Sequence, residues 1–338
     1  MTPRTDVPLA PLTTFHIGGR ARFFIDAQTE EGIGEAVLFA QEKKLPLLVL
    51  GAGSNVLVGD DTIEAVVLRV TLADVEFQNE GDDTLCIAGA GASWDSVVDA
   101  VGARGLFGVE NLAGIPGTLG GAAVQNIGAY GAELSQVFVY ADTIHRITGV
   151  QRRVALHDAA FAYRTSLFKK DKDLLITRVA LRFLPSTVAN LSYPDLAKRQ
   201  VAGESLATPA EIAREVRAIR AQKFPQGDEG GTAGSFFKNP IIARKLADSL
   251  SARFPGLPTF LQKNGEVKVS LAWVLDHVLA LKGYEKGRTR LYEKQPLVIV
   301  ARAGATATEV DALARDVAEK VFLATGILLE REVENFSA

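Results

Sequence analysis

A glycine-rich stretch near the middle of the chain constrains the fold more than any other feature. Residues 113–131 read AGIPGTLGGAAVQNIGAYG, with six glycines, one proline and no charged side chain. Glycine lets a ligand approach the main chain, and free N–H groups bind phosphate without a side-chain charge. The stretch therefore predicts a loop that binds an anionic cofactor. A flexible linker is the competing interpretation, but linkers are usually polar, whereas Ile115, Leu119 and Val124 are interspersed among these glycines.

A second glycine run lies upstream and directly follows an apolar segment. Residues 47–50 read LLVL and predict a short buried strand, and GAGSNV follows at 51–56. A strand followed by a glycine turn places free N–H groups at the carboxyl end of the strand. The run lacks the GK[ST] of a Walker loop and the third glycine of the dinucleotide-binding fingerprint. Two glycine loops without a standard nucleotide motif indicate a less common cofactor-binding fold.

Composition excludes several classes of function. The 338 residues suggest two or three domains, and a net charge of −3 gives no indication of a nucleic-acid or membrane-surface partner. Cys86 is the only cysteine, which excludes an intrachain disulfide and a cysteine-based metal site and fits a reducing compartment. The sequence shows neither a signal-peptide pattern nor an apolar run of membrane-spanning length. We therefore expect a cytoplasmic protein that binds no nucleic acid and does not enter a membrane.

The chain falls into regions of different character. Strands and helices alternate over the first 110 residues, residues 142–183 read as β-structure, and residues 184–207 lack a regular pattern. A glycine- and acid-rich segment at 224–231 precedes a separate α/β unit, which we expect to end in a strand over 327–336. Within the β region, residues 175–183 alternate as a half-buried strand does. Five helices are predicted from their capping residues, which are Thr29, Ser93, Thr208, Ser270 and Thr308.

Four polar residues stand in settings that call for an explanation. Arg164 follows two aromatic residues in a turn, where stacking on a ring is the commoner role and binding a carboxylate the alternative. Ser235 precedes two phenylalanines, where the start of a helix and a catalytic hydroxyl explain it equally well. Glu332 is expected in the terminal strand and Tyr193 in a loop, where solvated positions are the commoner outcome. The four histidines are scattered and no metal-ligand cluster occurs, so we predict no metal site.

The motifs and their order resemble those of the UDP-N-acetylenolpyruvoylglucosamine reductases, the flavoenzyme family called MurB. The resemblance extends over nearly the whole chain and is specific, because several motifs occur in the family's order and at its approximate spacing. The segments that carry it are GAGSNV at 51–56, IPGTLGG…QNIGAYG at 115–131, YRTS at 163–166, AGSFFKNP at 233–240 and LEREV at 329–333.

The resemblance implies an α+β fold in three parts. An FAD-binding half of the vanillyl-alcohol-oxidase (PCMH) type would comprise subdomain 1 at 12–71 and subdomain 2 at 72–223, which includes a tyrosine loop at about 188–200. An α/β substrate-binding domain at 224–338 would follow, its C-terminal strand returning to the active site. None of the glycine loops contains His or Cys, the usual covalent attachment points for flavin in this superfamily. We therefore expect non-covalent FAD in a monomeric enzyme.

The implied reaction is the NADPH-dependent reduction of the enolpyruvyl ether of UDP-N-acetylglucosamine to UDP-N-acetylmuramate, a peptidoglycan precursor. Hydride addition to the β-carbon creates negative charge on the α-carbon and its carboxylate, so the site needs a fixed cation, a hydrogen-bonding partner and a proton donor. Two alternatives stay open: a flavin oxidase of the same superfamily that passes electrons to oxygen, and a sugar-nucleotide sensor without turnover.

The family's catalytic residues correspond to Arg164, Ser235 and Glu332. The arginine and glutamate would polarise the carboxylate and stabilise the enolate, and the serine would donate the proton. The residues expected to hold FAD are Gly51, Ala52, Gly53, Ser54, Asn55, Pro116, Gly117, Gly120, Gly121, Asn126, Gly128, Ala129 and Tyr130. The residues expected to contact the substrate are Tyr163, Tyr193, Lys223 and Asn239.

The chain departs from the family pattern at a few positions. Thr14 stands where the family often has asparagine, Arg331 where a small residue or proline is expected, and Asn335 where an aromatic residue or glycine is expected. Since glutamates flank Arg331 on both sides, the assignment of Glu332 rather than Glu330 depends on the Glu-Val pair of the motif.

Overall fold

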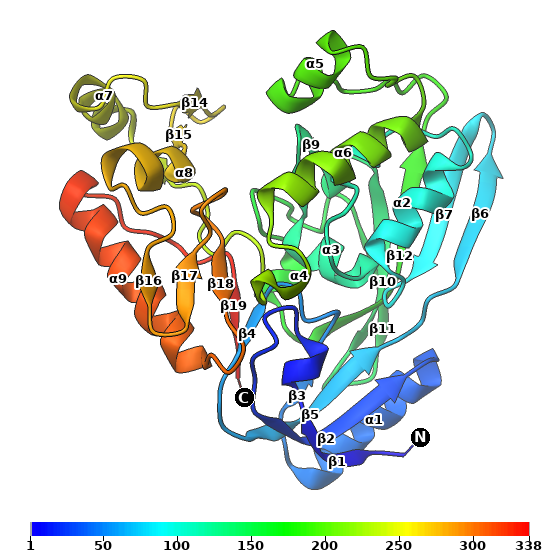
Figure 1. Ribbon diagram of the computed structural model, residues 1–338. Coiled ribbons are helices and arrows are strands. Elements are labelled where there is room, and N and C mark those ends of the chain that lie inside the picture. Colours follow the sequence, from blue (N-terminus) through cyan, green and yellow to red (C-terminus); the bar gives the residue numbers. More distant parts are fainter. Residues whose placement is uncertain (1, 338) are drawn as a thin grey trace.

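Two sheets organise the first two thirds of the molecule. The computed structural model describes residues 2–337 and is shown in Figure 1. Its first sheet has the strand order β1-β2-β5-β3, in which β2, β5 and β3 run parallel and β1 is antiparallel. These strands are β1 (Arg4–Pro8), β2 (Arg20–Ala27), β3 (Leu47–Val49) and β5 (Ile63–Val70). The strand predicted before the first glycine loop is therefore confirmed as β3, but it is only partly buried, because Val49 is exposed.

Helix α1 (Glu30–Lys43) connects β2 to β3 and covers this sheet. Thr29 caps the helix as predicted, because its hydroxyl accepts a hydrogen bond from the Gly32 N–H at 3.1 Å. Ile33 and Val37, one turn apart, are buried in the same core as strands β2 and β5. The helix ends at Lys44, which adopts the left-handed conformation.

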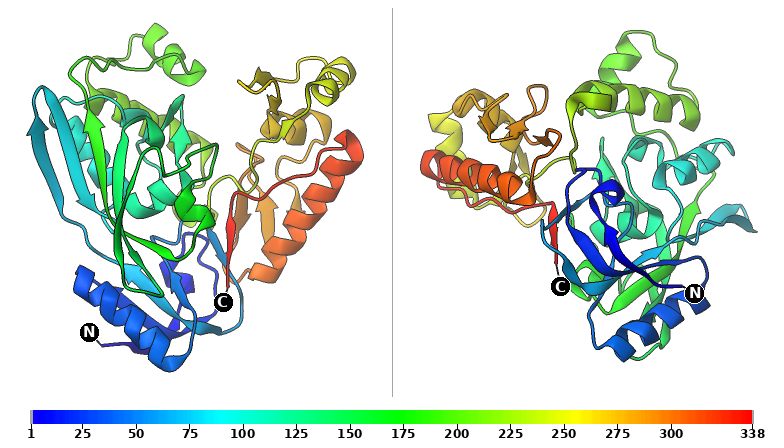
Figure 2. Two further views of the ribbon diagram at one scale, coloured as in Figure 1. Left: turned by 180° about the vertical axis from the view of Figure 1, so that it is seen from behind. Right: turned by 60° about the horizontal axis from the view of Figure 1, so that its bottom comes forward.

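The second sheet is antiparallel, with the order β11-β10-β12-β7-β6. Its strands are β6 (Val75–Glu80), β7 (Asp83–Gly89), β10 (Phe138–His145), β11 (Gln151–Ala155) and β12 (Leu174–Phe183). Helices α2 (Trp94–Gly102), α3 (Leu119–Gln125) and α6 (Pro209–Lys223) lie together over one face of this sheet (Figures 1 and 2). The glycine-rich stretch is thus ordered and contains α3, which contradicts the linker interpretation.

Strand β12 is more deeply buried than its alternation predicts. Ile176 and Ala180, expected on an exposed face, are buried, whereas Arg178 and Arg182 remain accessible. The prediction of a half-buried strand was therefore wrong for much of this strand. β12 pairs with β10 and β7 along its two edges, and α3 packs against it, so few of its side chains reach solvent.

Residues 184–207 contain a helix that the sequence pattern does not reveal. Helix α5 (Pro194–Val201) begins after Tyr193, with proline at its first position. Leu196 is its only buried residue, and one apolar anchor gives no detectable periodicity. The next helix, α6, follows the predicted capping box: the Thr208 hydroxyl accepts from the Glu211 N–H at 3.3 Å, and the Glu211 carboxylate accepts from the Thr208 N–H at 3.0 Å.

The last third forms two small sheets and helices that lie beside the first two thirds (Figures 1 and 2). One sheet has the order β13-β15-β14 and the other β16-β17-β18. The strands are β13 (Ile241–Ile242), β14 (Thr259–Leu261), β15 (Val267–Val269), β16 (Glu285–Lys286), β17 (Thr289–Leu291) and β18 (Ile299–Ala301). The helices are α7 (Arg244–Arg253), α8 (Leu271–Trp273), a π-helical turn (Val274–Val278) and α9 (Ala307–Thr325).

Two boundaries in this part differ from the sequence prediction. The cap of α9 is Thr306, not Thr308, because Thr306 and Glu309 form the capping box. Of the terminal strand expected over 327–336, only β19 (Glu334–Phe336) is regular, and it pairs in parallel with β4 (Val56–Val58). The residues before β19 bond instead to residues 236–238, so no continuous ladder forms.

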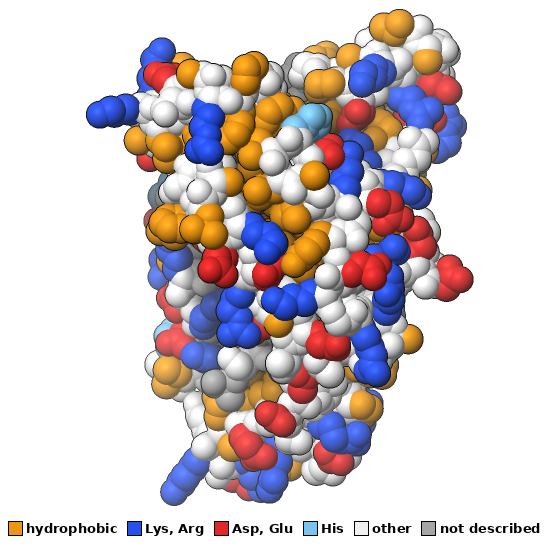
Figure 3. Space-filling view, turned by 60° about the vertical axis from the view of Figure 1, so that its left-hand side comes forward, with side chains coloured by type: hydrophobic (Ala, Val, Ile, Leu, Met, Phe, Trp, Pro, Cys, Tyr) orange, Lys and Arg blue, Asp and Glu red, His pale blue; other side chains and the backbone are white. Residues whose placement is uncertain are grey.

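The remaining elements are short. They are the β8–β9 hairpin (Gly128–Ala129, Ala132–Glu133), α4 (Leu167–Lys170) and the 3₁₀ turns Ala10–Leu12, Glu110–Leu112, Leu134–Gln136 and Gly227–Glu229. The buried core of the last third also includes Phe15, Ile17 and Leu57 from the start of the chain. The division at 71/72 and 223/224 stays a prediction. No helix within residues 2–337 is long and apolar enough to cross a membrane, and acidic and basic side chains are interspersed on the face shown in Figure 3.

Candidate functional site

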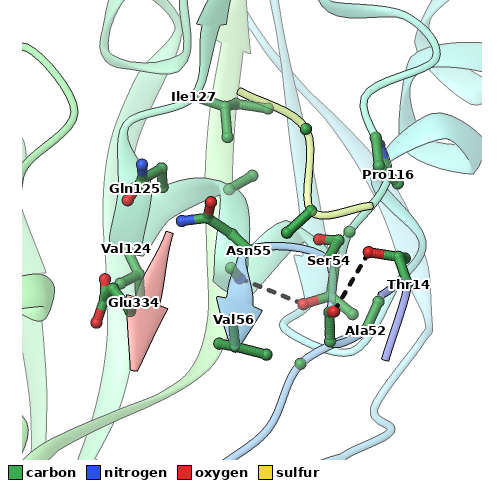
Figure 4. Close-up of a pocket in the computed structure, with 18 of the residues that line it drawn as sticks. Thr14, Ala52, Ser54, Asn55, Val56, Pro116, Val124, Gln125, Ile127 and Glu334 are labelled. Atoms are coloured by element: carbon green, nitrogen blue, oxygen red, sulfur yellow. Dashed lines mark hydrogen bonds between the residues drawn. The ribbon is translucent and has the colours of Figure 1, made fainter. Parts of the chain in front are cut away.

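The two predicted glycine loops lie against each other and line one cavity of about 1000 Å³ (Figure 4). A β-carbon built on Gly51 would lie 3.2 Å from the Thr118 hydroxyl, and one built on Gly117 would lie 3.3 Å from the Ser54 hydroxyl. The loops at 51–55 and 114–118 are therefore in contact and together form part of the cavity wall. This volume is at the upper end of the range typical of cofactor and ligand pockets.

Gly53 is the position in the first loop where only glycine fits. Its φ is +64°, and a β-carbon there would lie 2.1 Å from the Leu12 carbonyl oxygen. The Thr14 N–H and hydroxyl both donate to the Gly53 carbonyl, at 3.1 and 3.4 Å. Thr14, which replaces the expected asparagine, therefore holds the loop against the N-terminal segment.

The first loop presents an unused set of backbone donors. The N–H groups of residues 51–55 donate to no acceptor within residues 2–337, although these residues line the cavity. Consecutive free N–H groups form a concave binding site for an anion. The arrangement fits the diphosphate of a dinucleotide cofactor, which such groups hold without a side-chain charge.

The second loop supplies close packing rather than free donors at its helix start. The Leu119 and Gly120 N–H groups donate to the Ala92 and Ala90 carbonyls at 2.9 and 2.8 Å. A β-carbon on Gly120 would lie 2.9 Å from the Ala90 β-carbon. Gly120 is thus required for the contact of α3 with the turn after β7, and the cavity wall depends on that contact.

Most of the predicted cofactor residues line the cavity. They are Gly51, Ala52, Gly53, Ser54, Asn55, Pro116, Gly117, Gly120, Gly121, Gly128 and Ala129. Asn126 and Tyr130 do not. The buried Asn126 amide donates to Glu133 and to the Ala162 carbonyl, at 3.2 and 3.1 Å, and accepts from the Ser135 N–H at 3.0 Å. These hydrogen bonds hold neighbouring loops together, and the left-handed backbone at Asn126 ends α3.

Arg164 and Glu332, far apart in sequence, form an ion pair at the cavity. The Arg164 Nε donates to Glu332 Oε1 at 2.7 Å, and its Nη2 donates to the Gly128 carbonyl at 2.5 Å. The two side chains are 18% and 15% exposed, so solvent screens the pair only partly. Arg164 has a φ of +53°, an unfavourable left-handed backbone for a residue with a side chain. Although its guanidinium also lies 5.2 Å from the Tyr163 ring, ring stacking on the surface does not describe this arginine.

The C-terminal segment brings Glu332 to this position. The Glu332 N–H donates to the Phe236 carbonyl at 2.9 Å, and the Asn55 amide donates to the Glu332 carbonyl at 3.1 Å. Glu330, the other candidate, pairs with Lys238 and has a 72% exposed side chain. Arg331 between them pairs with Asp311 on α9 at 2.6 Å, which gives the unexpected arginine a partner outside the cavity.

Ser235 lines the same cavity from the last third of the chain. It forms a β-bridge with Val298 and precedes Phe236, whose N–H donates to the Leu297 carbonyl at 2.8 Å. The nearest helix begins at Arg244, so the helix-start interpretation was wrong. The Ser235 hydroxyl has no hydrogen-bond partner in the part of the chain that the structure describes and is free to act on a ligand.

The predicted substrate residues lie outside the cavity wall, in two groups. Tyr193 packs edge-on against Tyr130 with ring centroids 5.0 Å apart, and the Lys223 ammonium lies 5.6 Å from the Tyr130 ring. Lys223 also pairs with Asp195 on α5. Burial would lower the pKa of Lys223, but Asp195 and the nearby tyrosines raise it overall.

The second group joins the first two thirds of the chain to the last third. Burial raises the pKa of Tyr163, whose hydroxyl interacts with Asn239. The Asn239 Oδ1 accepts from the Leu271 N–H at 3.0 Å, so the amide also caps α8. The Lys268 ammonium on β15 lies 5.3 Å from the Tyr163 ring.

Sequence reasoning missed several polar residues at the site. Gln125 at the end of α3 donates to Glu332 Oε1 at 3.3 Å, and Lys169 on α4 donates to Gln125 Oε1 at 2.7 Å. Arg220 on α6 lines the cavity and donates to the Gly114 carbonyl at 3.0 Å, and burial lowers its pKa. Gln125 carried a signal, as a polar side chain in an otherwise uncharged stretch, whereas nothing in the sequence distinguished Lys169 or Arg220 from surface residues.

Two family models match the chain. One is described as an FAD binding domain and matches residues 21–152, which contain both glycine loops. The other is described as the C-terminal domain of UDP-N-acetylenolpyruvoylglucosamine reductase and matches residues 225–336, which contain Ser235 and Glu332. The predicted FAD-binding fold and the domain that follows it are thereby confirmed.

Relatives with this activity in their names match nearly the whole chain. The UDP-N-acetylenolpyruvoylglucosamine reductase of Pseudomonas aeruginosa is 39% identical over 96% of this chain and 96% of its own length. That of Escherichia coli K12 is 34% identical over 98% of this chain and 96% of its own length. The crystal structure of the reductase (MurB) from Thermus caldophilus superposes with a TM-score of 0.69 at 25% identity, covering 99% of this chain and 100% of that one.

Proposed function

The chain belongs to the UDP-N-acetylenolpyruvoylglucosamine reductase (MurB) family, and from this premise we propose that it reduces the enolpyruvyl ether of UDP-N-acetylglucosamine to UDP-N-acetylmuramate. The reaction adds a hydride equivalent to the β-carbon and a proton to the α-carbon, with NADPH as the source of the two electrons. One observation carries the proposal: the Arg164–Glu332 pair and the free Ser235 hydroxyl line the same cavity as the two glycine loops.

The cavity fits FAD, the cofactor that the matched binding domain implies. The unused N–H groups of residues 51–55 and the close approach allowed at Gly117 suit a diphosphate. Arg220 and Arg146 also line the cavity and add positive charge. FAD, when bound, supplies the two-electron chemistry, so no protein nucleophile is required.

Arg164 is proposed to bind the carboxylate of the enolpyruvyl group. Its Nε is used by Glu332 and its Nη2 by the Gly128 carbonyl, which leaves Nη1 free to donate. As negative charge grows on the α-carbon and carboxylate, a cation held in advance lowers the barrier because it needs no reorganisation. Glu332 keeps the guanidinium oriented and, through its second oxygen, can contact the substrate.

Ser235 is proposed to donate the proton to the α-carbon. A serine hydroxyl is a weak acid in water, but an enolate formed beside it is a strong base. Arg164, which lines the same cavity, would stabilise the charge left on oxygen. The free hydroxyl supports this role, because a hydroxyl already bonded to the protein would have to break that bond first.

We propose that Tyr193, Lys223, Tyr163 and Asn239 bind the UDP-sugar. Lys223 and Asn239 suit the diphosphate and its neighbours, and the half-exposed Tyr193 begins a short helix at the cavity mouth that could close over the substrate. On substrate binding, the Lys223 ammonium would leave the Asp195 carboxylate and pair with a phosphate, so that it keeps an anionic partner.

Two half-reactions test this function. Purified protein should contain FAD, lose its flavin absorbance on anaerobic addition of NADPH, and regain it when UDP-N-acetylglucosamine enolpyruvate is added, with UDP-N-acetylmuramate identified by mass. In heavy water the product should carry deuterium at the α-carbon. Reoxidation by oxygen but not by the enolpyruvyl substrate would favour the oxidase alternative, and binding without turnover would favour the sensor.

A further inference from the structure

A chain of hydrogen bonds leads from Lys169 on helix α4 to the carboxylate of Glu332. The Lys169 ammonium donates to Gln125 Oε1 at 2.7 Å. The Gln125 Nε2 then donates to Glu332 Oε1 at 3.3 Å, the same oxygen that accepts from Arg164 Nε at 2.7 Å. Lys169 is only 16% exposed and does not line the cavity itself, so it acts on Glu332 through Gln125.

The direction of these bonds is set by Lys169. An ammonium group can only donate, so the Gln125 atom that faces it must be the carbonyl oxygen. The amide NH₂ of Gln125 must then face Glu332, which accepts. In the opposite amide orientation, Gln125 would present its oxygen to Glu332 Oε1, and two acceptors would face each other without a hydrogen between them.

The surroundings keep Lys169 in place. Its ammonium also pairs with Glu334 at 3.2 Å, and Glu334 pairs in turn with Lys172 at 2.9 Å. Burial would raise the pKa of Glu334, but the contacts with Lys172 and Lys169 lower it overall, so this carboxylate stays ionised. Figure 4 shows Glu334 on β19 and Gln125 at the end of α3 on the same side of the cavity, near Asn55.

We propose that Lys169 is a positioning residue for the reduction, which acts through Gln125 to hold Glu332 as an acceptor turned towards Arg164. The inference rests on the proposed function, since it assigns the relay to the step in which Arg164 meets the substrate carboxylate. Without Lys169 the Gln125 amide is held only by its 3.3 Å hydrogen bond to Glu332, so it moves more freely. Glu332 then loses a donor in part of the population, and Arg164 is less well oriented when substrate arrives.

The test compares K169M with the matched control K170M. Both changes remove one cation from α4, but only K169M removes the donor to Gln125. Lys170 is exposed, lies outside the cavity lining and forms no ion pair within residues 2–337. Anaerobic stopped-flow should show reoxidation of reduced K169M by the enolpyruvyl substrate slowed about 10- to 100-fold, the scale of losing a hydrogen bond to a charged group. Reduction by NADPH and FAD content should stay within about twofold of wild type, because neither depends on Glu332 orientation. K170M should match wild type in both half-reactions, and K169R should recover most of the lost rate.

Two further variants distinguish loss of the relay from misfolding and from an effect of Lys169 that does not pass through Gln125. Q125M should slow reoxidation as K169M does, since it breaks the same relay at its centre. In an E332Q background, K169M should cause no further loss, because the relay then has no carboxylate to orient.

The outcomes separate the relay from the proposed function. Failure of the enolpyruvyl substrate to reoxidise the wild-type flavin would overturn both. If wild type turns over and K169M reoxidises as fast as K170M, the relay is wrong and the function stands. Equal losses of NADPH reduction, FAD content and reoxidation in K169M would make Lys169 merely structural, and an additive loss in K169M/E332Q would place its effect elsewhere; either result overturns the inference.

Discussion

Gly53→Ala should damage the cofactor site by an amount that the structure allows us to bound. The left-handed backbone at Gly53 costs an alanine about 1–2 kcal/mol. The new β-carbon would also lie 2.1 Å from the Leu12 carbonyl, a backbone atom that cannot rotate away. The loop must therefore move and weaken the Thr14 hydrogen bonds to the Gly53 carbonyl, at a further cost of about 1 kcal/mol. The total loss should be about 2–3 kcal/mol.

This loss can appear in folding or in FAD binding, so both are measured. Chemical unfolding of the holoprotein at a fixed FAD concentration reports the sum, and quenching of flavin fluorescence on titration of the apoprotein reports the binding share. Gly34→Ala is the matched control. Gly34 lies inside α1 with nothing within 4 Å of its built β-carbon, so alanine should stabilise the protein by about 0.5–1 kcal/mol and leave FAD affinity unchanged.

The two glycine-to-alanine changes should therefore shift the free energy of unfolding in opposite directions: Gly53→Ala lowers it and Gly34→Ala raises it. If the free energy of unfolding of Gly53→Ala is within about 0.5 kcal/mol of the wild-type value and FAD binds equally well, the loop adapts to a side chain and its shape does not depend on glycine. A loss of the same size in Gly34→Ala would show that the assay responds to any change in this sheet and helix.

Three other predictions concern single side chains. Ser235→Ala should slow flavin reoxidation by the enolpyruvyl substrate about 10²–10⁴-fold but leave the melting temperature and NADPH reduction unchanged, because its hydroxyl bonds to no other described residue; reoxidation at the wild-type rate would move the proton donor to water or Glu332. Tyr193→Phe should weaken UDP-sugar binding, measured by calorimetry, without slowing NADPH reduction, and an unchanged affinity would contradict a substrate contact. Burial raises the pKa of the Cys86 thiol from 9.0 to about 11. The stability that depends on the neutral thiol should thus persist below pH 9 and fall as the pH rises towards 11, and a disulfide reagent at pH 8 should label Cys86 only after unfolding.

The glycine loops could be predicted because their chemistry is local. A strand followed by glycines in the first loop, and a glycine-dense uncharged stretch in the second, require unusual backbone angles wherever they occur. Asn126 and Tyr130 belong to the same motif but do not line the cavity. A motif tells which residues occur together, not which of them reach the cavity wall. Whether they contact a bound ligand stays a prediction.

Ser235 shows what a local pattern omits. A glycine and serine before an apolar run are typical of a helix start, yet the serine pairs with Val298 in a β-bridge. That partner lies more than sixty residues away, and no feature near Ser235 indicates it. Lys169 was missed for a similar reason, because its importance depends on a glutamine from another helix and a glutamate from the end of the chain.

Arg164 explains why the site requires contacts between distant parts of the chain. A left-handed backbone at a residue with a side chain costs about 1–3 kcal/mol, and the tight turn at 162–165 cannot offset it alone. The charge-assisted hydrogen bonds to Glu332 and the Gly128 carbonyl are of the size needed to hold it there. Glu332 is fixed through its own backbone to Phe236 and to Asn55 of the first glycine loop. Docking of the C-terminal segment therefore stabilises the strained arginine, and we expect the conformation proposed to bind the substrate carboxylate to depend on the assembled cavity.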